Sequence, residues 1–195
     1  MPPFLTHNFS ELPEEFFTLQ DWQGFDNPKI VIENHAMKKE LGMEDTEHQE
    51  LLEIFNGTKK IGSLKPLSMV YSGHQFGQYV EQLGDGRGLL FAQINSNEGL
   101  LDIHLKGAGK TPYSRFGDGR AVLRSVIREY LCGEAMHALS IPTSRALMII
   151  GSDEMVIREK SESAAMLVRT SKTHIRFGSF EYFHYNNKPE HVKAL

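Results

Sequence analysis

Hydrophobic and polar residues alternate most regularly between residues 89 and 106, and this alternation predicts two β-strands. The predicted strands are Leu89–Ile94 and Leu100–Lys106, and a polar turn that ends in glycine separates them. In the second strand the odd-numbered positions are aliphatic, whereas Asp102, His104 and Lys106 occupy even-numbered ones. Because successive side chains of a strand point to opposite faces, these three polar groups are predicted to share one face of an antiparallel hairpin.

A longer helical pattern begins after Gly119. Residues from about 120 to 139, which precede Pro142, favour a helix because their apolar residues recur at helical spacing. The positions that share its broad apolar face are Val122, Val126, Tyr130, Gly133 and Met136. Glu129 lies at the edge of this face, so its carboxylate is predicted to approach packed apolar surface.

The first third of the chain predicts short helices joined by loops. Asn34 is suited to cap a helix from about His35 to Leu41, which a glycine then ends. Thr46, with acidic residues around it, can open a second helix that ends at Asn56. We therefore expect residues 1–65 to form a helical N-terminal extension.

Further strands are predicted on both sides of the long helix. Met69–Tyr71 and Ala164–Arg169 are predicted strands, and Ala146–Ile150 is predicted to pair with Met155–Arg158 as a hairpin. Antiparallel strands that flank one long helix are typical of an α+β fold and not of alternating βαβ units. Residues 66–195 are therefore predicted to form one lobe.

Composition argues against several classes of protein. The chain has 195 residues, of which 40% are hydrophobic and 24% are charged, as in an ordinary globular protein. Its net charge of -4 gives no basis for binding nucleic acid or an anionic membrane surface. The longest aliphatic run, Ala146–Ile150, is far shorter than the roughly 20 residues of a membrane-spanning helix. A single cysteine, Cys132, fits a reducing compartment, so we expect a cytoplasmic protein.

Glu129 needs a positive partner, because an unpaired carboxylate against apolar surface costs several kcal/mol. Lys106 is the natural candidate, since it ends the strand that carries the polar row. In the alternative, Glu129 reaches water at the edge of the helix and Lys106 is an ordinary surface lysine. The residues alone leave both possibilities open.

Two glycine-rich segments have the composition of phosphate-binding loops. Residues 84–88 contain three glycines, which permit close backbone approach to a phosphate or ribose with Arg87 as a charge partner, although a hairpin turn has the same composition. Residues 107–111 end in Gly-Lys-Thr, as a P-loop does. His104 stands where that motif requires its first glycine, so we exclude a P-loop.

Asp118 and the two arginines near residue 170 each have a structural and a functional interpretation. Asp118 either caps the long helix or meets a nucleotide at its positive end. Arg169 and Arg176 flank a hydroxyl-rich segment that either clamps phosphates or is a solvated loop. The histidines show no zinc-type spacing, so no metal site is predicted in this chain. Cys132 is predicted to be a small core residue of the helix.

Several unusual motifs lie along the chain, and together they resemble those of the selenoprotein O family. The segments that carry the resemblance are Ser72–Gly77, Leu83–Arg87, Leu105–Gly109, Thr111–Arg115, Gly117–Ser125 and Ile127–Glu129. Weaker likeness near both ends extends it over essentially the whole chain, and the block from 72 to 145 is highly specific.

The resemblance implies a protein-kinase-like fold and transfer of AMP from ATP to hydroxyl side chains of proteins, with release of pyrophosphate. It implies that Lys106 and Glu129 are the lysine–glutamate pair of the small lobe, and that the lysine contacts phosphate. Arg169 and Arg176 would hold the far phosphates of an ATP bound in reversed orientation. The other implied nucleotide contacts are Gly84, Gly86, Arg87, Asp118 and Gly119.

Members of that family continue into a helical large lobe that holds a catalytic Asp and the Asn and Asp that bind Mg²⁺ or Mn²⁺. We therefore expect this chain to be a small lobe that is incomplete by itself, with a separate C-terminal lobe or a second copy as partner. One alternative is a non-enzymatic module that binds a nucleotide or a partner. Another is ordinary phosphoryl transfer, with ADP as product.

Overall fold

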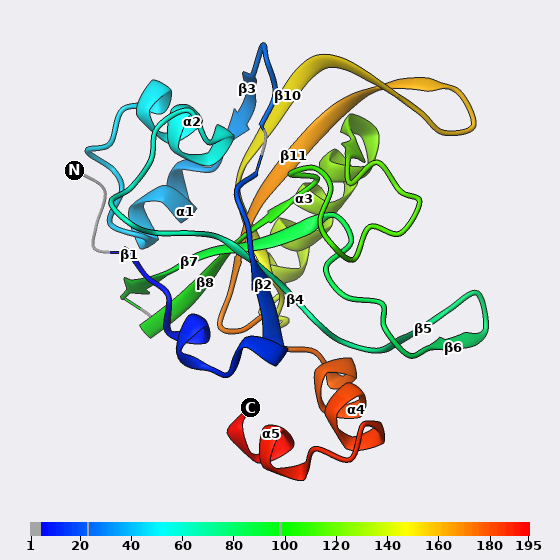
Figure 1. Ribbon diagram of the computed structural model, residues 1–195. Helices are drawn as coiled ribbons and strands as arrows, with labels where there is room; N and C mark the ends of the chain where they lie inside the picture. The colour runs from blue at the N-terminus through cyan, green and yellow to red at the C-terminus, as the bar shows by residue number, and fades with distance from the viewer. Residues whose placement is uncertain (1–4, 23, 98) are drawn as a thin grey trace.

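The computed structural model describes residues 5–22, 24–97 and 99–195, and it shows a large antiparallel sheet with few helices (Figure 1). The predicted α+β class is thereby confirmed. Glu98, in the turn predicted between residues 94 and 100, lies outside the described residues. The helices are α1 (His35–Glu40), α2 (His48–Asn56), α3 (Leu123–Ala138), α4 (Phe177–Tyr185) and α5 (Pro189–Ala194), and short 3-10 turns occupy Asn8–Glu11 and Glu14–Phe16.

The strands of the main sheet include the predicted hairpin, now seen as β7 and β8. In chain order these strands are β1 (Leu5–Thr6), β2 (Phe17–Leu19), β3 (Lys29–Glu33), β4 (Leu67–Met69), β7 (Gly88–Ser96), β8 (Gly99–Lys106), β9 (Ala121–Val122), β10 (Arg145–Ile157) and β11 (Ser161–Ser171). Among the described residues their spatial order is β2-β4-β7-β8-β11-β10-β3, with β1 paired to β7 and β9 to β11. A separate ribbon joins β5 (Gly73–Gln75) and β6 (Gln78–Val80).

One face of the sheet meets α1 and α2 and carries most of the hydrophobic core. The aliphatic residues Ile103 and Leu105 of β8 are fully buried on this face. They belong to the same cluster as Met37 of α1 and as Leu51 and Phe55 of α2. The first third of the chain therefore shares its core with the sheet.

The opposite face of the sheet is covered by α3. Val126 of α3 is buried against Ile149 of β10 and Leu167 of β11. Gly133, two turns further along the helix, is also buried. Glu129 lies between these two positions, so the helix that packs on β10 and β11 carries a carboxylate toward the neighbouring strand β8.

Two strands from the first third of the chain complete the sheet at its edges. β2 pairs with β4 and β3 pairs with β10, both antiparallel. The sequence pattern does not indicate them, because they contain three and five residues and their burial does not alternate cleanly. Asn34, directly after β3, does cap α1, since its side chain accepts a hydrogen bond from the Met37 amide at 3.1 Å.

The hairpin predicted from Ala146–Ile150 and Met155–Arg158 is wrong. Ala146–Ile150 and residues 155–157 belong to one strand, β10, which pairs with β11 on both sides of residues 152–154 and with β3 along its other edge. The polar residues between them have the composition of a turn, but they form an irregularity in the exposed part of the strand. Their charges are paired with other elements: Asp153 with Lys29 at 2.8 Å and Glu154 with Arg120 at 2.9 Å.

The long helix differs from its prediction at three points. It begins at Leu123 instead of about 120, because Ala121 and Val122 pair with β11 as strand β9. Cys132 is exposed, so its prediction as a core residue is wrong. Met136 is 37% exposed and does not share the buried face of Val126.

Two boundaries shift in the earlier part of the chain. α2 starts at His48 with Glu47 at its N-cap, so Thr46 does not open it. β4 ends at Met69, where the predicted strand begins. Within the described ranges, no helix has both the length and the apolar character that crossing a membrane requires.

The shared core makes the first third of the chain integral to folding. Leu51 of α2 is fully buried, whereas Leu131 of α3 is 61% exposed. Leu51→Ala should lower the free energy of unfolding by about 2–5 kcal/mol, because it leaves a cavity in a close-packed core. The matched change Leu131→Ala should alter it by less than about 1 kcal/mol. Chemical denaturation measures both, and equal effects would contradict the shared core.

Candidate functional site

A row of polar side chains crosses the sheet on the face that α3 covers. Asp102, His104 and Lys106 alternate with the aliphatic residues of β8, as the sequence pattern predicts. In the antiparallel register of β8 and β11, Lys106 lies opposite Leu167 and His104 lies opposite Arg169. Because paired residues of adjacent strands project to the same side, Arg169 joins the polar row.

The predicted pairing of Lys106 with Glu129 is confirmed, and a third residue takes part. The Lys106 ammonium donates a hydrogen bond to Oε2 of Glu129. Nη1 of Arg169 donates to the other carboxylate oxygen, Oε1, at 2.9 Å. One carboxylate from α3 thus accepts hydrogen bonds from cations on both β8 and β11.

Burial and pairing oppose each other in this cluster. Burial alone would raise the pKa of Glu129, but the hydrogen bond from Lys106 and the charge of Arg169 outweigh it, so the pKa lies below its usual value. Burial lowers the pKa of Lys106 even though Glu129 opposes the shift. Burial likewise lowers the pKa of Arg169. Glu129 is therefore ionised. A further negative charge beside Lys106 and Arg169 would stabilise the charged forms of these two side chains.

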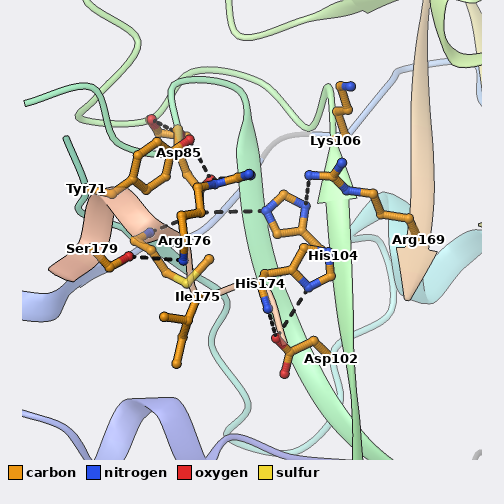
Figure 2. Close-up of polar contacts among 12 residues, drawn as sticks. Tyr71, Asp85, Asp102, His104, Lys106, Arg169, His174, Ile175, Arg176 and Ser179 are labelled. Carbon is orange, nitrogen blue, oxygen red and sulfur yellow. Dashed lines mark hydrogen bonds and ion pairs between the residues drawn. The ribbon is translucent and has the colours of Figure 1, made fainter. Parts of the chain in front are cut away.

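His104 continues the chain of contacts from Arg169 toward the next loop. Its Nδ1 lies 3.5 Å from Nη2 of Arg169, and its Nε2 lies 3.6 Å from Oδ2 of Asp85 (Figure 2). A guanidinium can only donate, so Nδ1 is the accepting nitrogen and the ring proton resides on Nε2, facing the carboxylate. His104 is therefore a neutral ring that connects a cation to an anion.

Asp85 is a buried carboxylate held by several donors. The Met69 amide donates to its Oδ2 at 3.2 Å, and the Tyr71 hydroxyl donates to its Oδ1 at 3.3 Å. Nη2 of Arg176 lies 3.9 Å from Oδ1. Burial alone would raise the pKa of Asp85, but contact with His104, the Arg176 charge and the Met69 amide bring it down to about 2.

Arg176 is held on three sides at the start of α4. Its guanidinium lies over the ring of Tyr71, 4.9 Å from the ring centre. Its backbone amide donates to Oγ of Ser179 at 3.4 Å. Two residues further on, the Gly178 carbonyl accepts a hydrogen bond from the Ser72 amide at 2.9 Å. A Cβ on Gly178 would lie 1.8 Å from the Ser72 carbonyl oxygen, so a side chain there would prevent this contact.

A second histidine lies behind the first. The rings of His104 and His174 are stacked, with centres 4.6 Å apart. Oδ2 of Asp102 accepts hydrogen bonds from the backbone amide of His174 at 2.7 Å and from its Nδ1 at 3.3 Å. Gln93 donates to the other oxygen of Asp102 at 2.7 Å. Asp102 thus fixes the loop that leads from β11 to Arg176.

The five remaining predicted residues, Gly84, Gly86, Arg87, Asp118 and Gly119, all line one pocket of about 530 Å³. Gly84 and Gly86 pack closely against Tyr113, which lines the same pocket. Asp118 does not cap α3: its oxygens pair with Arg158 at 2.6 and 2.9 Å and accept the Arg120 amide at 2.9 Å.

The predicted residues therefore form two neighbouring groups. Lys106, Glu129, Arg169 and Arg176 belong to the ionic network, and the other five line the pocket. The two groups meet at Arg87, since its carbonyl accepts the Gly107 amide at 2.7 Å and the next residue, Gly88, pairs with Lys106 across the sheet.

Sequence reasoning assigned no role at the site to Tyr71, Asp85, His104 and His174 of the network. It also missed Tyr113 and Arg158 of the pocket. His104 carried a usable signal, because it alternates with Lys106 on a predicted strand. The other contacts join segments far apart in the sequence, which no local pattern indicates.

The network suits an anionic ligand. Lys106, Arg169 and Arg176 contact the carboxylates of Glu129 and Asp85, while a third carboxylate, that of Asp102, contacts His174. The side chains of Lys106 and Arg176 are 23% and 41% exposed, so these two cations are accessible. Nε of Arg169 is buried and has no hydrogen-bond partner among the residues that the structure describes. Donors of this kind fit phosphate oxygens.

A metal site of the protein's own is not evident in the described ranges. Within residues 5–22, 24–97 and 99–195, no three His, Cys, Asp or Glu side chains are grouped so that they could hold a metal ion.

The buried His104 should make folding stability depend on pH. Burial, together with the nearby charges of Arg169 and His174, lowers its pKa from 6.5 to about 3. As pH falls below about 6.5, the unfolded chain binds a proton that the folded protein does not, so the free energy of unfolding should decrease toward pH 3. His104→Gln removes this titration and should flatten the slope. Urea denaturation between pH 7 and 4.5 measures it, and an equally steep slope would contradict the prediction.

Known proteins match this chain over nearly its whole length. The sequence model of the family described as "Protein adenylyltransferase SelO" matches residues 3–195. Relatives named "Protein nucleotidyltransferase YdiU" from Vibrio parahaemolyticus, Pseudomonas fluorescens and Myxococcus xanthus are 53%, 51% and 49% identical to it. The matches cover 97% of this chain and 39% of each relative, so the chain spans about two fifths of the length of these curated relatives. The chain belongs to the family of the protein adenylyltransferase SelO.

Proposed function

We propose that this chain is the ATP-binding part of a protein adenylyltransferase, which transfers AMP from ATP to hydroxyl side chains of proteins and releases pyrophosphate. The observation that carries the proposal is the Glu129 carboxylate, which holds Lys106 and Arg169 side by side. Family membership supports nucleotidyl transfer as the class of reaction. A cytoplasmic location is part of the proposal, since a single cysteine fits a reducing compartment.

The proposal includes a protein-kinase-like small lobe for residues 66–195, preceded by the N-terminal extension. In protein kinases a strand lysine pairs with a helix glutamate so that the lysine can contact the nucleotide phosphates. Lys106 ends strand β8 and Glu129 lies on the helix that packs over the sheet, which is the same arrangement of elements. This correspondence supports the kinase-like assignment.

The residues of the network and of the pocket would contact different parts of ATP. Lys106, Arg169 and Arg176 would hold phosphate oxygens, and Gly84, Gly86, Arg87, Asp118 and Gly119 would contact the rest of the nucleotide. ATP supplies the electrophilic α-phosphorus and pyrophosphate as the leaving group. If the far phosphates rest on the two arginines, the α-phosphate is left facing the acceptor hydroxyl. The same cations would stabilise the negative charge that develops on the departing pyrophosphate.

Two further parts of the reaction are expected from elsewhere in the full-length protein. The Mg²⁺ or Mn²⁺ that accompanies ATP needs oxygen ligands, and we expect them, with the group that removes the proton of the acceptor, in a C-terminal lobe. The protein substrate and this lobe are therefore the proposed partners of the chain.

Lys106→Ala in the full-length protein should decrease the transfer of labelled AMP to protein by about 100-fold or more, because it removes a donor to the reacting phosphates. The matched control is Lys59→Ala, since Lys59 is a half-exposed lysine that pairs with Glu50 on the surface. This control should retain wild-type activity. Transfer from labelled ATP in the presence of Mg²⁺ or Mn²⁺ provides the measurement.

Three outcomes would contradict the proposal in different ways. A Lys106→Ala protein as active as the wild type would remove the lysine from the mechanism. Calorimetric binding of ATP by the full-length protein without any transfer would favour a non-enzymatic nucleotide-binding module. Release of ADP instead of pyrophosphate would identify a kinase.

A further inference from the structure

The two arginines of the network are connected through the interior of the protein by residues that face neither solvent nor the pocket. The connection runs from Arg169 to His104, from His104 to Asp85 and from Asp85 to Arg176, with separations of 3.5, 3.6 and 3.9 Å (Figure 2). His104 and Asp85 are 1% and 3% exposed. These two residues cannot reach a ligand outside, so any role in binding must act through the arginines.

Few side chains could replace His104 in this connection. One end must accept a hydrogen bond from a guanidinium, and the other end must face a carboxylate with a donor. Neutral His104 meets both needs with its two ring nitrogens. A protonated ring would lose the accepting nitrogen and place a second cation against Arg169. Burial keeps the ring neutral, since it lowers the pKa of His104.

Simple packing would not require such a connection. A buried carboxylate is costly, and apolar residues of similar volume often stabilise a core equally well or better. The surrounding backbone nevertheless leaves room for it: a Cβ on Gly88 would lie 2.5 Å from Cε1 of His104 and 3.4 Å from Oδ1 of Asp85. The apolar cluster that includes Leu90, Met69 and Phe183 lies on the same side of the sheet, so polar residues are not the default there.

We propose that Asp85 and His104 are positioning residues that hold Arg169 and Arg176 at a fixed separation, so that the two guanidiniums act together on the terminal phosphates of the nucleotide. This inference rests on the proposed function, because it assigns the arginines to a nucleoside triphosphate. Arg169 is oriented by Glu129 from one side and by His104 from the other. Arg176 is oriented by Asp85 and by the ring of Tyr71.

We call the connection from Arg169 through His104 and Asp85 to Arg176 the bridge. Loss of the bridge should weaken the binding of the terminal phosphates and leave the binding of the rest of the nucleotide unchanged. ATP has the terminal phosphates that the arginines would hold, whereas AMP lacks them. A variant without the bridge should bind ATP more weakly while its affinity for AMP stays the same. A general loss of stability would instead weaken both nucleotides by the same factor, or neither.

The experiment compares full-length wild type with His104→Phe and Asp85→Asn by calorimetry, with ATP and AMP as the probes. His104→Phe keeps a flat ring against His174 but removes both nitrogens, and Asp85→Asn removes the charge opposite Arg176. Each should raise the Kd for ATP about tenfold or more and change that for AMP less than twofold, because His104→Phe removes the acceptor for Arg169 and Asp85→Asn removes the ion pair with Arg176. The KM for ATP in AMP transfer should rise in parallel.

Two further variants separate positioning from stability. His104→Gln retains a donor and an acceptor and should recover much of the ATP affinity that His104→Phe loses. Leu51→Ala is remote from the network and serves as the destabilised control, which should keep the wild-type ratio of ATP to AMP affinity. Thermal unfolding of every variant shows that the folded protein is being compared.

The possible results lead to different conclusions. Equal losses for ATP and AMP, or wild-type ATP affinity in both His104→Phe and Asp85→Asn, would overturn the bridge and leave the proposed function intact. A wild-type protein that binds ATP no better than AMP would overturn the proposed function and the bridge with it. Selective loss of ATP affinity, with recovery in His104→Gln, supports the bridge.

Discussion

The carboxylate of Glu129 sets the geometry on which the rest of the site depends. α3 lies on the sheet through apolar contacts such as that of Val126 with Leu167, and such contacts are not directional. Two charged hydrogen bonds to one carboxylate are directional, and they come from different strands. Together they fix the rotation of α3 about its axis. They also fix the separation of Lys106 and Arg169, which the strand register alone sets only to within the length of two flexible side chains.

The surroundings of this cluster explain why it can be strong. On one side lies the apolar contact between α3 and β11, and on the other lies the cluster of Leu90, Met69 and Phe183 beside α4. Charges flanked by apolar surface interact more strongly than charges in water, and each unpaired one costs more. The network accordingly pairs its charges inside the protein, and its more exposed cations, Lys106 and Arg176, lie nearer the surface. This distribution links the packing of the sheet to its capacity to bind an anion.

The sequence predicts the contact of Lys106 with Glu129 better than it predicts the strands around that contact. Lys106 and Glu129 each lie in a regular element, one in a strand of period two and one in a helix of period 3.6. These periods make their pairing one of two possibilities, and the family resemblance favours it. Arg169 was assigned to phosphates through the family resemblance, but its bond to Glu129 depends on the register of β8 against β11, which no local pattern gives. Asp85 lies between glycines in a segment whose composition also fits a hairpin turn, and no local pattern indicates its burial beside Met69 and Tyr71.

The errors have a common physical origin. Residues 151–154 are polar and begin with glycine, as turns do, but charged partners on β3 and before β9 stabilise them inside a continuous strand. Cys132 lies one residue from buried Gly133, yet a rotation of about 100° per residue takes it to the exposed side of α3. The edge strands β2 and β3 are formed by pairing with distant partners, so their own residues indicate them weakly.

The close contact between Gly178 and Ser72 also determines how much chain can separate the two arginines. Arg169 is placed by the register of β11, and Gly178 is placed by the Ser72 backbone, so the segment between them is anchored at both ends. Inserting or deleting one residue there would shift Arg176 relative to Tyr71 and Asp85, and neither anchor could move to compensate. The turn between β10 and β11, around residues 158–160, is anchored differently, through the pairing of the Arg158 guanidinium with Asp118 at 2.6 and 2.9 Å. The number of residues between Arg169 and Arg176 is thus constrained by the structure, independently of which residues they are.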